Sequence, residues 1–374
     1  MQLRFSNDIE RLKQMSKILV GMSGGVDSAV AAYLLKKEGH EVTGLTLRTW
    51  ETETGEDSRC CEIDDARRVA GKLGIPYHVQ NCLSDFKKYV TEPFTEQYIH
   101  GFTPNPCVEC NRYVKWDRML FYADILGLEY VATGHYAYIK KLDNGRYTVK
   151  CAESANKDQT YMLYRLTQEQ LSRTLMPLGS YTKDEVRDIA REAGIPVAEK
   201  ADSQEICFVT DGHYADFIEA NAQSDVPGPG EFVDEEGNVL GIHKGITHYT
   251  VGQRKGLNLA LGYPAYITKI DADTNRIIIG QENSIYSKEI ICRNCNFLSI
   301  SGLEPGEELS CRAKVRYHFP LKDAVISAID KDSLRIVFDE PVRAAAPGQS
   351  AVFYDEDDCV IGGGMIFEAV ASKD

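Results

Sequence analysis

The chain has 374 residues, of which 43% are hydrophobic and 26% are charged, and its formal net charge is −14. This composition is ordinary for a soluble globular protein, and the length predicts two or three domains that can each bury a core. No apolar run approaches the ~18 residues that cross a bilayer, which excludes a membrane-spanning protein. The acidic balance argues against nonspecific nucleic-acid binding, because phosphate contacts need Lys and Arg, but it leaves room for a local basic patch.

The N-terminal stretch MQLRFSNDIERLKQM is charged throughout and has no apolar signal core. We therefore expect a cytoplasmic protein without a membrane partner. The chain has 11 cysteines, an odd number without an export signal. This argues against a disulfide framework and favours metal or redox chemistry for cysteines that cluster.

Strand and helix patterns alternate along the first half of the chain. Strands are predicted over 17–22, 41–47, 75–80 and 130–133, and helices over 27–37, 64–73 and 85–99, followed by a Pro-rich turn and a long helix. Alternation of this kind predicts an α/β fold with a doubly wound parallel sheet. After about residue 215 the pattern changes to short alternating strands with frequent Gly, which predicts two small, mainly-β modules. We place the boundaries near Ala215 and Ile285, giving domains over 1–215, 216–284 and 285–374.

The motif SGGVDS, residues 23 to 28, lies between the first predicted strand and the first helix. Its glycines allow the backbone to approach an anion, and the helix dipole favours negative charge there. The Lys that clamps a γ-phosphate in the common P-loop is missing, since Val26 and Asp27 follow the last Gly. The motif therefore predicts a bound pyrophosphate that leaves during adenylation. The alternative is an ordinary Gly turn.

Two cysteines lie in TPNPCVEC, residues 103 to 110. Asn105 suits a helix N-cap and Pro106 the first helical position. Cys107 and Cys110 are then expected one turn apart on one face, with thiol pKa values lowered by the helix N-terminus. The alternative is a pair of buried cysteines.

A third cysteine, Cys207 in DSQEICFV, follows a predicted helix that begins with a capping box of Thr182 and Glu185 and ends at Gly194. In the C-terminal module, CRAKVRYH is predicted to be a strand. Its basic residues Arg312, Lys314, Arg316 and His318 would share one face, which suits a phosphate backbone. The alternative is a solvated edge strand.

Seven motifs occur in order from about Lys17 to about Gly364: GMSGGVDS, TPNPCVECNR, ATGHYA, NKDQTYML, DSQEICF, HYTVGQRKGL and PGQSAVFY. GMSGGVDS resembles the PP-loop of the ATP pyrophosphatases, and the whole set resembles the bacterial tRNA-specific 2-thiouridylases. This resemblance implies thiolation at C2 of the wobble uridine of tRNA with ATP and Mg²⁺. It implies tRNAs for Lys, Glu and Gln as substrates. The sulfur donor is expected to be a cysteine desulfurase or a relay protein.

The resemblance also implies roles for single residues. The ATP site is expected to comprise Gly21, Met22, Ser23, Gly24, Gly25, Val26, Asp27, Ser28, Leu47 and Gly134. The segment against the target base is Asn105, Pro106 and Cys107, and the base is expected to be flipped out. The tRNA contacts are His135, Lys157, Asp158, Gln159, Arg316, Tyr317 and Gln349.

The resemblance makes Cys207 the persulfide carrier and Cys110 its catalytic partner, with which it forms a disulfide. Cys107 departs from the family, whose members often have Asp at this position. Cys107, Cys110 and Cys207 could therefore instead hold a [4Fe–4S] cluster whose free iron carries the sulfide. The persulfide route needs only the two cysteines at family positions.

Two other functions are compatible with parts of the sequence. A PP-loop ligase that amidates a small molecule would use SGGVDS, but it would leave Cys110, Cys207 and the β modules without a role. A tRNA-binding module with a relic nucleotide site would bind tRNA without forming AMP. Dependence of pyrophosphate release on tRNA distinguishes the three.

Overall fold

The structure is a computed structural model that describes residues 15–51, 62–201, 206–209 and 214–371. Our expectation for the N-terminal stretch concerns mainly residues 1–14, which lie outside this range. Within the described residues, each helix is too short or too polar to cross a membrane.

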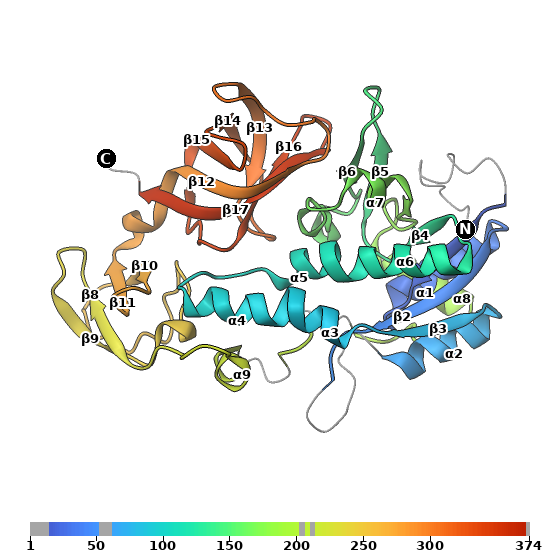
Figure 1. Ribbon diagram of the computed structural model, residues 1–374, viewed down its shortest axis with the longest axis horizontal. Coiled ribbons are helices and arrows are strands. Elements are labelled where there is room, and N and C mark those ends of the chain that lie inside the picture. Colours follow the sequence, from blue (N-terminus) through green and yellow to red (C-terminus); the bar gives the residue numbers. More distant parts are fainter. Residues whose placement is uncertain (1–14, 52–61, 202–205, 210–213, 372–374) are drawn as a thin grey trace.

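A five-stranded parallel sheet forms the centre of the first part of the chain (Figure 1). In spatial order its strands are β3 (Tyr77–Asn81), β2 (Glu41–Arg48), β1 (Lys17–Gly21), β4 (Tyr130–Ala132) and β7 (Thr174–Leu175). Neighbouring strands pair in parallel throughout. The predicted α/β fold class is confirmed.

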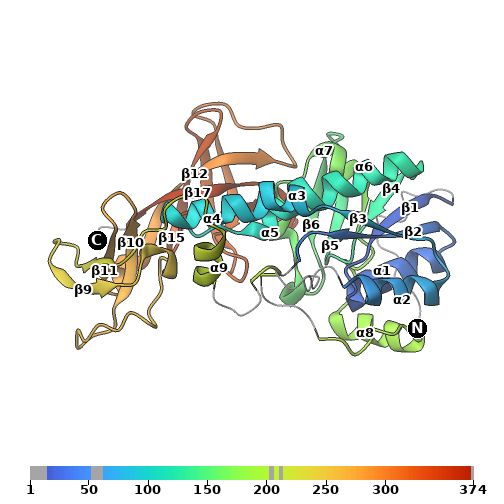
Figure 2. The same ribbon diagram turned by 60° about the horizontal axis from the view of Figure 1, so that its bottom comes forward.

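Helices cover both faces of this sheet. Successive side chains of β1 point to opposite faces and are therefore buried in two different cores. Ile18 and Val20 belong to the core that contains α1 (Val26–Lys37), α2 (Ile63–Leu73) and α8 (Lys183–Glu192). Leu19 belongs to a second core with α6 (Asp117–Leu126). Figure 2 shows α6 on one side of the sheet and α1, α2 and α8 on the other.

Two helical rods each contain a π-helical turn that the sequence pattern did not predict. The first consists of α3 (Leu83–Phe86), η1 (Lys87–Thr91) and α4 (Glu92–Ile99). The second consists of α5 (Pro106–Glu109), η2 (Cys110–Trp116) and α6. The rods pack side by side and extend from the sheet toward the β modules (Figure 1).

The rest of the chain is mainly β. A four-stranded sheet has the order β10-β11-β8-β9, and a closed six-stranded barrel has the order β12-β15-β14-β13-β16-β17. The bounds are β8 (Gly230–Val233), β9 (Val239–His243), β10 (Tyr266–Asp271), β11 (Arg276–Gly280), β12 (Tyr286–Phe297), β13 (Glu308–Lys314), β14 (Lys322–Ala328), β15 (Ser333–Arg343), β16 (Ser350–Tyr354) and β17 (Val360–Ala371). The hairpin β5 (Ala137–Lys141) and β6 (Tyr147–Cys151) stands between the parallel sheet and the barrel (Figure 1). The helical pieces not yet named are η3 (Ala155–Lys157), η4 (Thr160–Met162), α7 (Gln168–Ser172), α9 (Tyr214–Asn221), η5 (Ile246–His248) and η6 (Glu282–Ile285). The domain boundaries near Ala215 and Ile285 stay a prediction.

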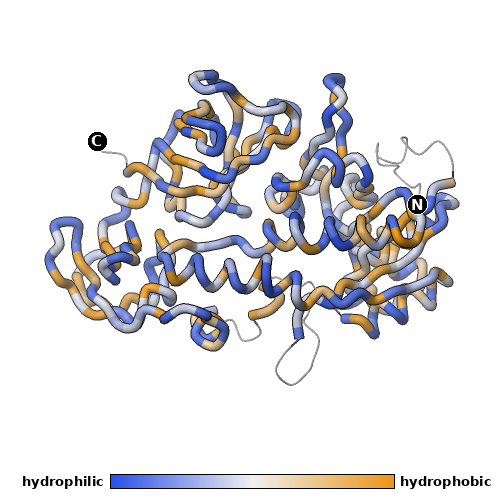
Figure 3. Tube along the Cα trace, viewed as in Figure 1, coloured by the Kyte–Doolittle hydropathy of each residue, from blue (hydrophilic) through white to orange (hydrophobic). Residues whose placement is uncertain are grey.

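Buried and partly buried hydrogen bonds join the barrel to the first part of the chain. The Tyr161 hydroxyl donates to the Ser350 carbonyl at 2.8 Å and accepts from its N–H at 3.2 Å. The Asn296 amide donates to the Tyr164 carbonyl at 2.7 Å. Val352 and Val360 of the barrel share the core that covers one face of the parallel sheet. Figure 3 shows that apolar residues occur both in the barrel and in the parallel-sheet part of the chain.

Candidate active site

The loop between β1 and α1 is shaped by its own serines. The Ser28 hydroxyl accepts from the Ser23 N–H at 3.2 Å and donates to the Gly25 carbonyl at 3.1 Å. The Gly25 N–H donates to the Ser23 hydroxyl at 3.4 Å. Gly25 is the N-cap of α1 without a side-chain hydrogen bond, an arrangement that suits an anion at the start of the helix.

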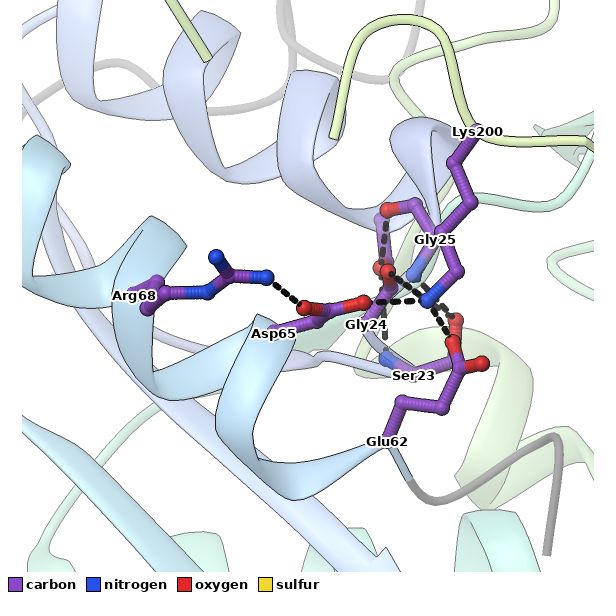
Figure 4. Close-up of polar contacts among 8 residues, drawn as sticks. Ser23, Gly24, Gly25, Glu62, Asp65, Arg68 and Lys200 are labelled. Carbon is purple, nitrogen blue, oxygen red and sulfur yellow. Dashed lines mark hydrogen bonds and ion pairs between the residues drawn. The ribbon is translucent and has the colours of Figure 1, made fainter. Parts of the chain in front are cut away.

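Lys200 fastens this loop to the start of α2 (Figure 4). Its ammonium contacts the carboxylates of Glu62 and Asp65 and donates to the Gly24 carbonyl at 3.3 Å. Hydrogen bonds from Lys200, and then from Arg68, hold the pKa of the Asp65 carboxyl below its ordinary value. No local pattern predicts this contact, since Lys200 and Gly24 lie 176 positions apart in the sequence.

Replacing Lys200 by Met is expected to lower the free energy of unfolding at pH 7 by roughly 1 kcal/mol, because the partly exposed pairs are screened by solvent. Since the folded-state pKa of Asp65 is depressed, this contribution is present above the unfolded pKa of about 4 and is lost as pH falls through the folded pKa. Urea unfolding of both proteins at pH 7 and pH 3 measures the difference. Arg191→Met, which removes the exposed pairs with Asp188 and Glu199, is the control. An undiminished difference at pH 3 would contradict the explanation.

A cavity of about 230 Å³ opens beside the loop. The predicted ATP residues that line it are Gly21, Met22, Ser23, Asp27, Ser28, Leu47 and Gly134. Gly24, Gly25 and Val26 continue the same loop. The other lining residues are Leu45, Thr49, Cys110, Lys115, Met119, Thr133, His135 and Gln159. A thiol and an ammonium group thus share the cavity with the loop.

Asp27 is anchored by residues from two other elements. Its carboxylate accepts from the Lys183 ammonium at 2.8 Å on both oxygens and from the Tyr136 hydroxyl at 2.7 Å. Gly134 packs against the same turn, where an added Cβ would lie 2.6 Å from the carbonyl carbon of Asp27 and the nitrogen of Ser28. Only Gly fits at this position without moving the start of α1.

His135 and Gln159, two of the predicted tRNA contacts, line the cavity. The Gln159 side chain accepts from the Tyr136 N–H at 2.9 Å. Burial, with a smaller effect of the Lys115 cation, lowers the pKa of His135 to about 3. This imidazole is therefore neutral at pH 7, and its ring lies 5.5 Å from that of Trp116.

The helix that carries Cys107 and Cys110 starts as predicted. Asn105 is its N-cap and accepts from the Cys107 N–H at 3.2 Å, and Pro106 is its first residue. The two thiols differ in environment, because Cys107 is exposed whereas Cys110 is buried against the cavity. The predicted lowering of the Cys107 pKa is wrong. Although Cys107 is exposed to solvent, the protein packed around its thiol desolvates it and raises its pKa, and the Lys115 cation offsets only part of this rise.

Cys207 lies in a turn and packs, half-buried, against an aromatic core on the first rod. Phe208 contacts Phe86 and Phe94 in this core, with ring centroids 5.6 and 5.1 Å apart. Cys110 belongs to the same core. The structure thus brings Cys110 and Cys207 to one apolar cluster.

Among the described residues, no three His, Cys, Asp or Glu side chains lie together in a way that could hold a metal ion. Cys107, Cys110 and Cys207 are all described, so they do not form a ligand set in this conformation. The residues as arranged do not fit a [4Fe–4S] cluster.

The predicted basic strand face of CRAKVRYH is wrong. Strand β13 ends at Lys314, and Arg316 and His318 lie in the bend and turn that follow. The Arg312 guanidinium pairs with Asp358 at 3.0 Å, and the buried Lys314 pairs with the buried Asp158 at 3.5 Å. Both strand cations are therefore paired with carboxylates of the same chain, the half-exposed Asp358 and the buried Asp158.

The other predicted tRNA contacts lie outside the cavity lining, and Gln349 contacts the segment that precedes Cys107. The Gln349 amide donates to the Thr103 carbonyl at 2.8 Å. The Tyr317 ring lies 6.1 Å from that of Tyr161, and burial raises the pKa of Tyr317 to about 12, with contributions from Asp158 and Cys107. Arg316 is half-buried beside Arg343. Lys157 is half-buried in η3, while Asp158 is bonded internally to Thr160 and Ala152.

Three family models match the chain in succession: "tRNA methyl transferase HUP domain" over residues 16–211, "tRNA methyl transferase PRC-barrel domain" over 215–281 and "Aminomethyltransferase beta-barrel domain" over 287–366. The chain is 52% identical to the tRNA-specific 2-thiouridylase MnmA of Acetivibrio thermocellus, over 94% of this chain and 99% of that protein. It is 49% identical to the enzyme of the same name from Lachnoclostridium phytofermentans, over 95% of this chain and 100% of that protein.

The chain belongs to the tRNA-specific 2-thiouridylase family.

Membership confirms the resemblance and makes the chain an enzyme, a sulfur-transferring transferase. Among solved structures, the NMN synthetase of Francisella tularensis is 20% identical with a TM-score of 0.34, covering 52% of this chain and 70% of that chain. The U34-tRNA thiolase NcsA of Methanococcus maripaludis, with its [4Fe-4S] cluster, is 20% identical with a TM-score of 0.36, covering 57% of this chain and 69% of that chain.

For this 2-thiouridylase family member, sequence reasoning missed three lysines at the site. Lys183 pairs with Asp27, Lys200 fastens the loop, and Lys115 lines the cavity. Lys183 directly follows the recognised capping-box residue Thr182, which is the one local signal that could have drawn attention to it.

Proposed function

We propose that the chain converts the wobble uridine (U34) of tRNA into 2-thiouridine at the expense of ATP, with tRNAs for Lys, Glu and Gln as substrates. The observation that carries this proposal is that Cys110 lines the same cavity as the Ser23–Ser28 loop. A nucleotide loop and a cysteine in one cavity allow an oxygen to be activated and then replaced by sulfur without release of the intermediate. The relatives' names support the same reaction.

In the first step, the Ser23–Ser28 loop with Leu47 and Gly134 holds ATP, and Asn105, Pro106 and Cys107 line a flipped-out uridine. Uridine O2 attacks the α-phosphorus, and the bond from that phosphorus to the oxygen bridging to the β-phosphate breaks. Pyrophosphate leaves, the N3 proton is lost to solvent and is regained when 2-thiouridine forms, and the uridine carries an O2-adenylate. The Asp27 carboxylate in the cavity is the donor type that Mg²⁺ prefers, and this ion would neutralise charge on the phosphates.

In the second step, the terminal sulfur of a Cys207 persulfide attacks C2 and the C2–O2 bond breaks, which releases AMP. The Cys110 thiolate then attacks the Cys207 sulfur and breaks its bond to the transferred sulfur. This leaves 2-thiouridine and a Cys110–Cys207 disulfide. A thiol reductant then reduces the disulfide and restores the two free thiols. Their common apolar core favours the pairing of these two cysteines. A cysteine desulfurase or a relay protein would reload the persulfide.

The predicted tRNA contacts divide into two groups. His135 and Gln159 line the cavity, so we assign them to the flipped nucleotide. Lys157, Arg316, Tyr317 and Gln349 lie outside this lining and are assigned to the anticodon loop around it. Asp158 is buried and accepts hydrogen bonds from Ala152 and Thr160. It would position the second group indirectly, through its ion pair with Lys314.

Release of pyrophosphate from ATP tests this proposal. We expect release to be at least about tenfold faster with a tRNA transcript carrying U34 than with the same transcript carrying C34. An amidating ligase would release pyrophosphate with a small-molecule acceptor and no tRNA, and a relic binding module would release none. Iron and acid-labile sulfide bound after anaerobic reconstitution would instead favour delivery of sulfur by a cluster.

A further inference from the structure

Lys115 occupies a position in the cavity that the proposed reaction has not yet used. Among the described residues that line the cavity, it carries the only permanent positive charge, since His135 is neutral. Lys183 and Lys200 also lie near the loop, but neither is among the residues that line the cavity. The loop itself lacks the lysine of the common P-loop.

The π-helical turn η2 (Cys110–Trp116) explains how Lys115 reaches the cavity. Residues five apart on an α-helix point ~140° away from each other, because each residue turns the helix by ~100°. A π-helix closes its hydrogen bonds between residues five apart, which brings such residues near one face. Cys110 and Lys115 are five apart, and both line the cavity. The π turn therefore places the thiol and the ammonium together.

The charge of Lys115 acts on groups that face the reaction. It lowers the pKa of both Cys107 and His135, so its ammonium lies within electrostatic range of the target-base segment and of the cavity wall. Ser23, Ser28 and Gly134 line the same cavity. An ammonium that lines this cavity and acts on the base segment is in a position to contact the α-phosphate of an ATP held by the loop.

We propose that Lys115 is a catalytic residue of the adenylation step, whose ammonium contacts the α-phosphate of ATP and stabilises the negative charge that develops as O2 attacks and pyrophosphate departs. This rests on the proposed function. Lys115 neither gains nor loses a proton in the step. It supplies from the second helical rod the cation that the common P-loop carries within its own sequence.

The test uses the full-length protein with ATP, Mg²⁺ and the U34 transcript, and measures pyrophosphate release in single turnovers. Removing one preorganised donor to a transition state costs ~10² to 10³ in rate. We expect Lys115→Met to lower the maximal rate about 10²-fold with less than about fivefold change in KM for ATP, and Lys115→Arg to recover part of the loss. Lys115→Ala should be accelerated by added ethylammonium. Lys141→Met, in the β5–β6 hairpin outside this cavity, should match the wild type.

Three outcomes would overturn the proposal. The first is a Lys115→Met maximal rate within about threefold of the wild type. The second is a rise in KM for ATP with an unchanged maximal rate, which would mean that Lys115 binds the ground state and the transition state equally well. The third is a loss of rate together with a lowered Tm and without ethylammonium rescue, which marks a structural role. If wild-type protein shows no tRNA-dependent release, the proposed function itself fails, so the two failures are distinguishable.

Discussion

Replacing Cys207 by Ser is expected to abolish formation of 2-thiouridine, by at least about 10³-fold, while tRNA-dependent pyrophosphate release stays within a few-fold of the wild type. A serine hydroxyl cannot carry a sulfane sulfur, but it leaves the ATP cavity intact, because Cys207 is not among the residues that line it. Residual rates of 10⁻³ or below are usual when a covalent nucleophile is removed. Thiolated nucleoside, quantified by mass spectrometry after tRNA digestion, and pyrophosphate, quantified enzymatically, give the two rates.

Cys295→Ser is the matched control, since Cys295 is also half-buried but belongs to the barrel strand β12. It should leave both rates unchanged. Unimpaired thiolation by the Cys207→Ser protein would place the reactive sulfur elsewhere. If the Cys207→Ser protein lost both bound iron and thiolation activity, Cys207 would be assigned as a ligand of a cluster.

Replacing Gly24 by Ala is expected to lower kcat/KM for ATP about 10³-fold. Gly24 has φ +80°, and an added Cβ would lie 2.6 Å from the carbonyl oxygen of Glu62 and 2.8 Å from its Cβ. The loop must therefore move, and a misplacement of about 1 Å lowers the reaction rate ~10²-fold. An alanine in the left-handed conformation adds ~1–2 kcal/mol of backbone strain. Steady-state pyrophosphate release at varied ATP concentration measures the effect.

Gly39→Ala separates this steric effect from backbone strain. Gly39 also has a positive φ, +93°, but an added Cβ there meets nothing within 4 Å. Its substitution should cost ~1 kcal/mol of stability and leave kcat/KM for ATP unchanged. If Gly24→Ala also behaves in this way, the contact with Glu62 is not what shapes the loop.

The sequence was most informative where structure is decided by neighbours along the chain. The apolar strand before SGGVDS, the capping box of Thr182 and Glu185, and the Asn105 cap with Pro106 all depend on residues within a few positions, and the structure confirms each.

The errors arose where distant residues decide the outcome. Lys314 was expected on an exposed basic face, but its partner Asp158 lies 156 positions away in the sequence and draws it into the interior. The π turn at Cys110 was missed because helical periodicity assumes 3.6 residues per turn. The sequence analysis therefore assigned no role to Lys115.

The buried pair of Asp158 and Lys314 has a consequence for protein engineering. Removing one member of a buried ion pair leaves an uncompensated charge, which costs ~3–5 kcal/mol. A chimera that takes its barrel from a relative must therefore supply a cation that pairs with Asp158, as Lys314 does. It must also supply a backbone carbonyl that accepts a hydrogen bond from the Tyr161 hydroxyl, as that of Ser350 does. The barrel and the segment around 158–164 should consequently be exchanged as one unit when substrate preference is transplanted between these enzymes.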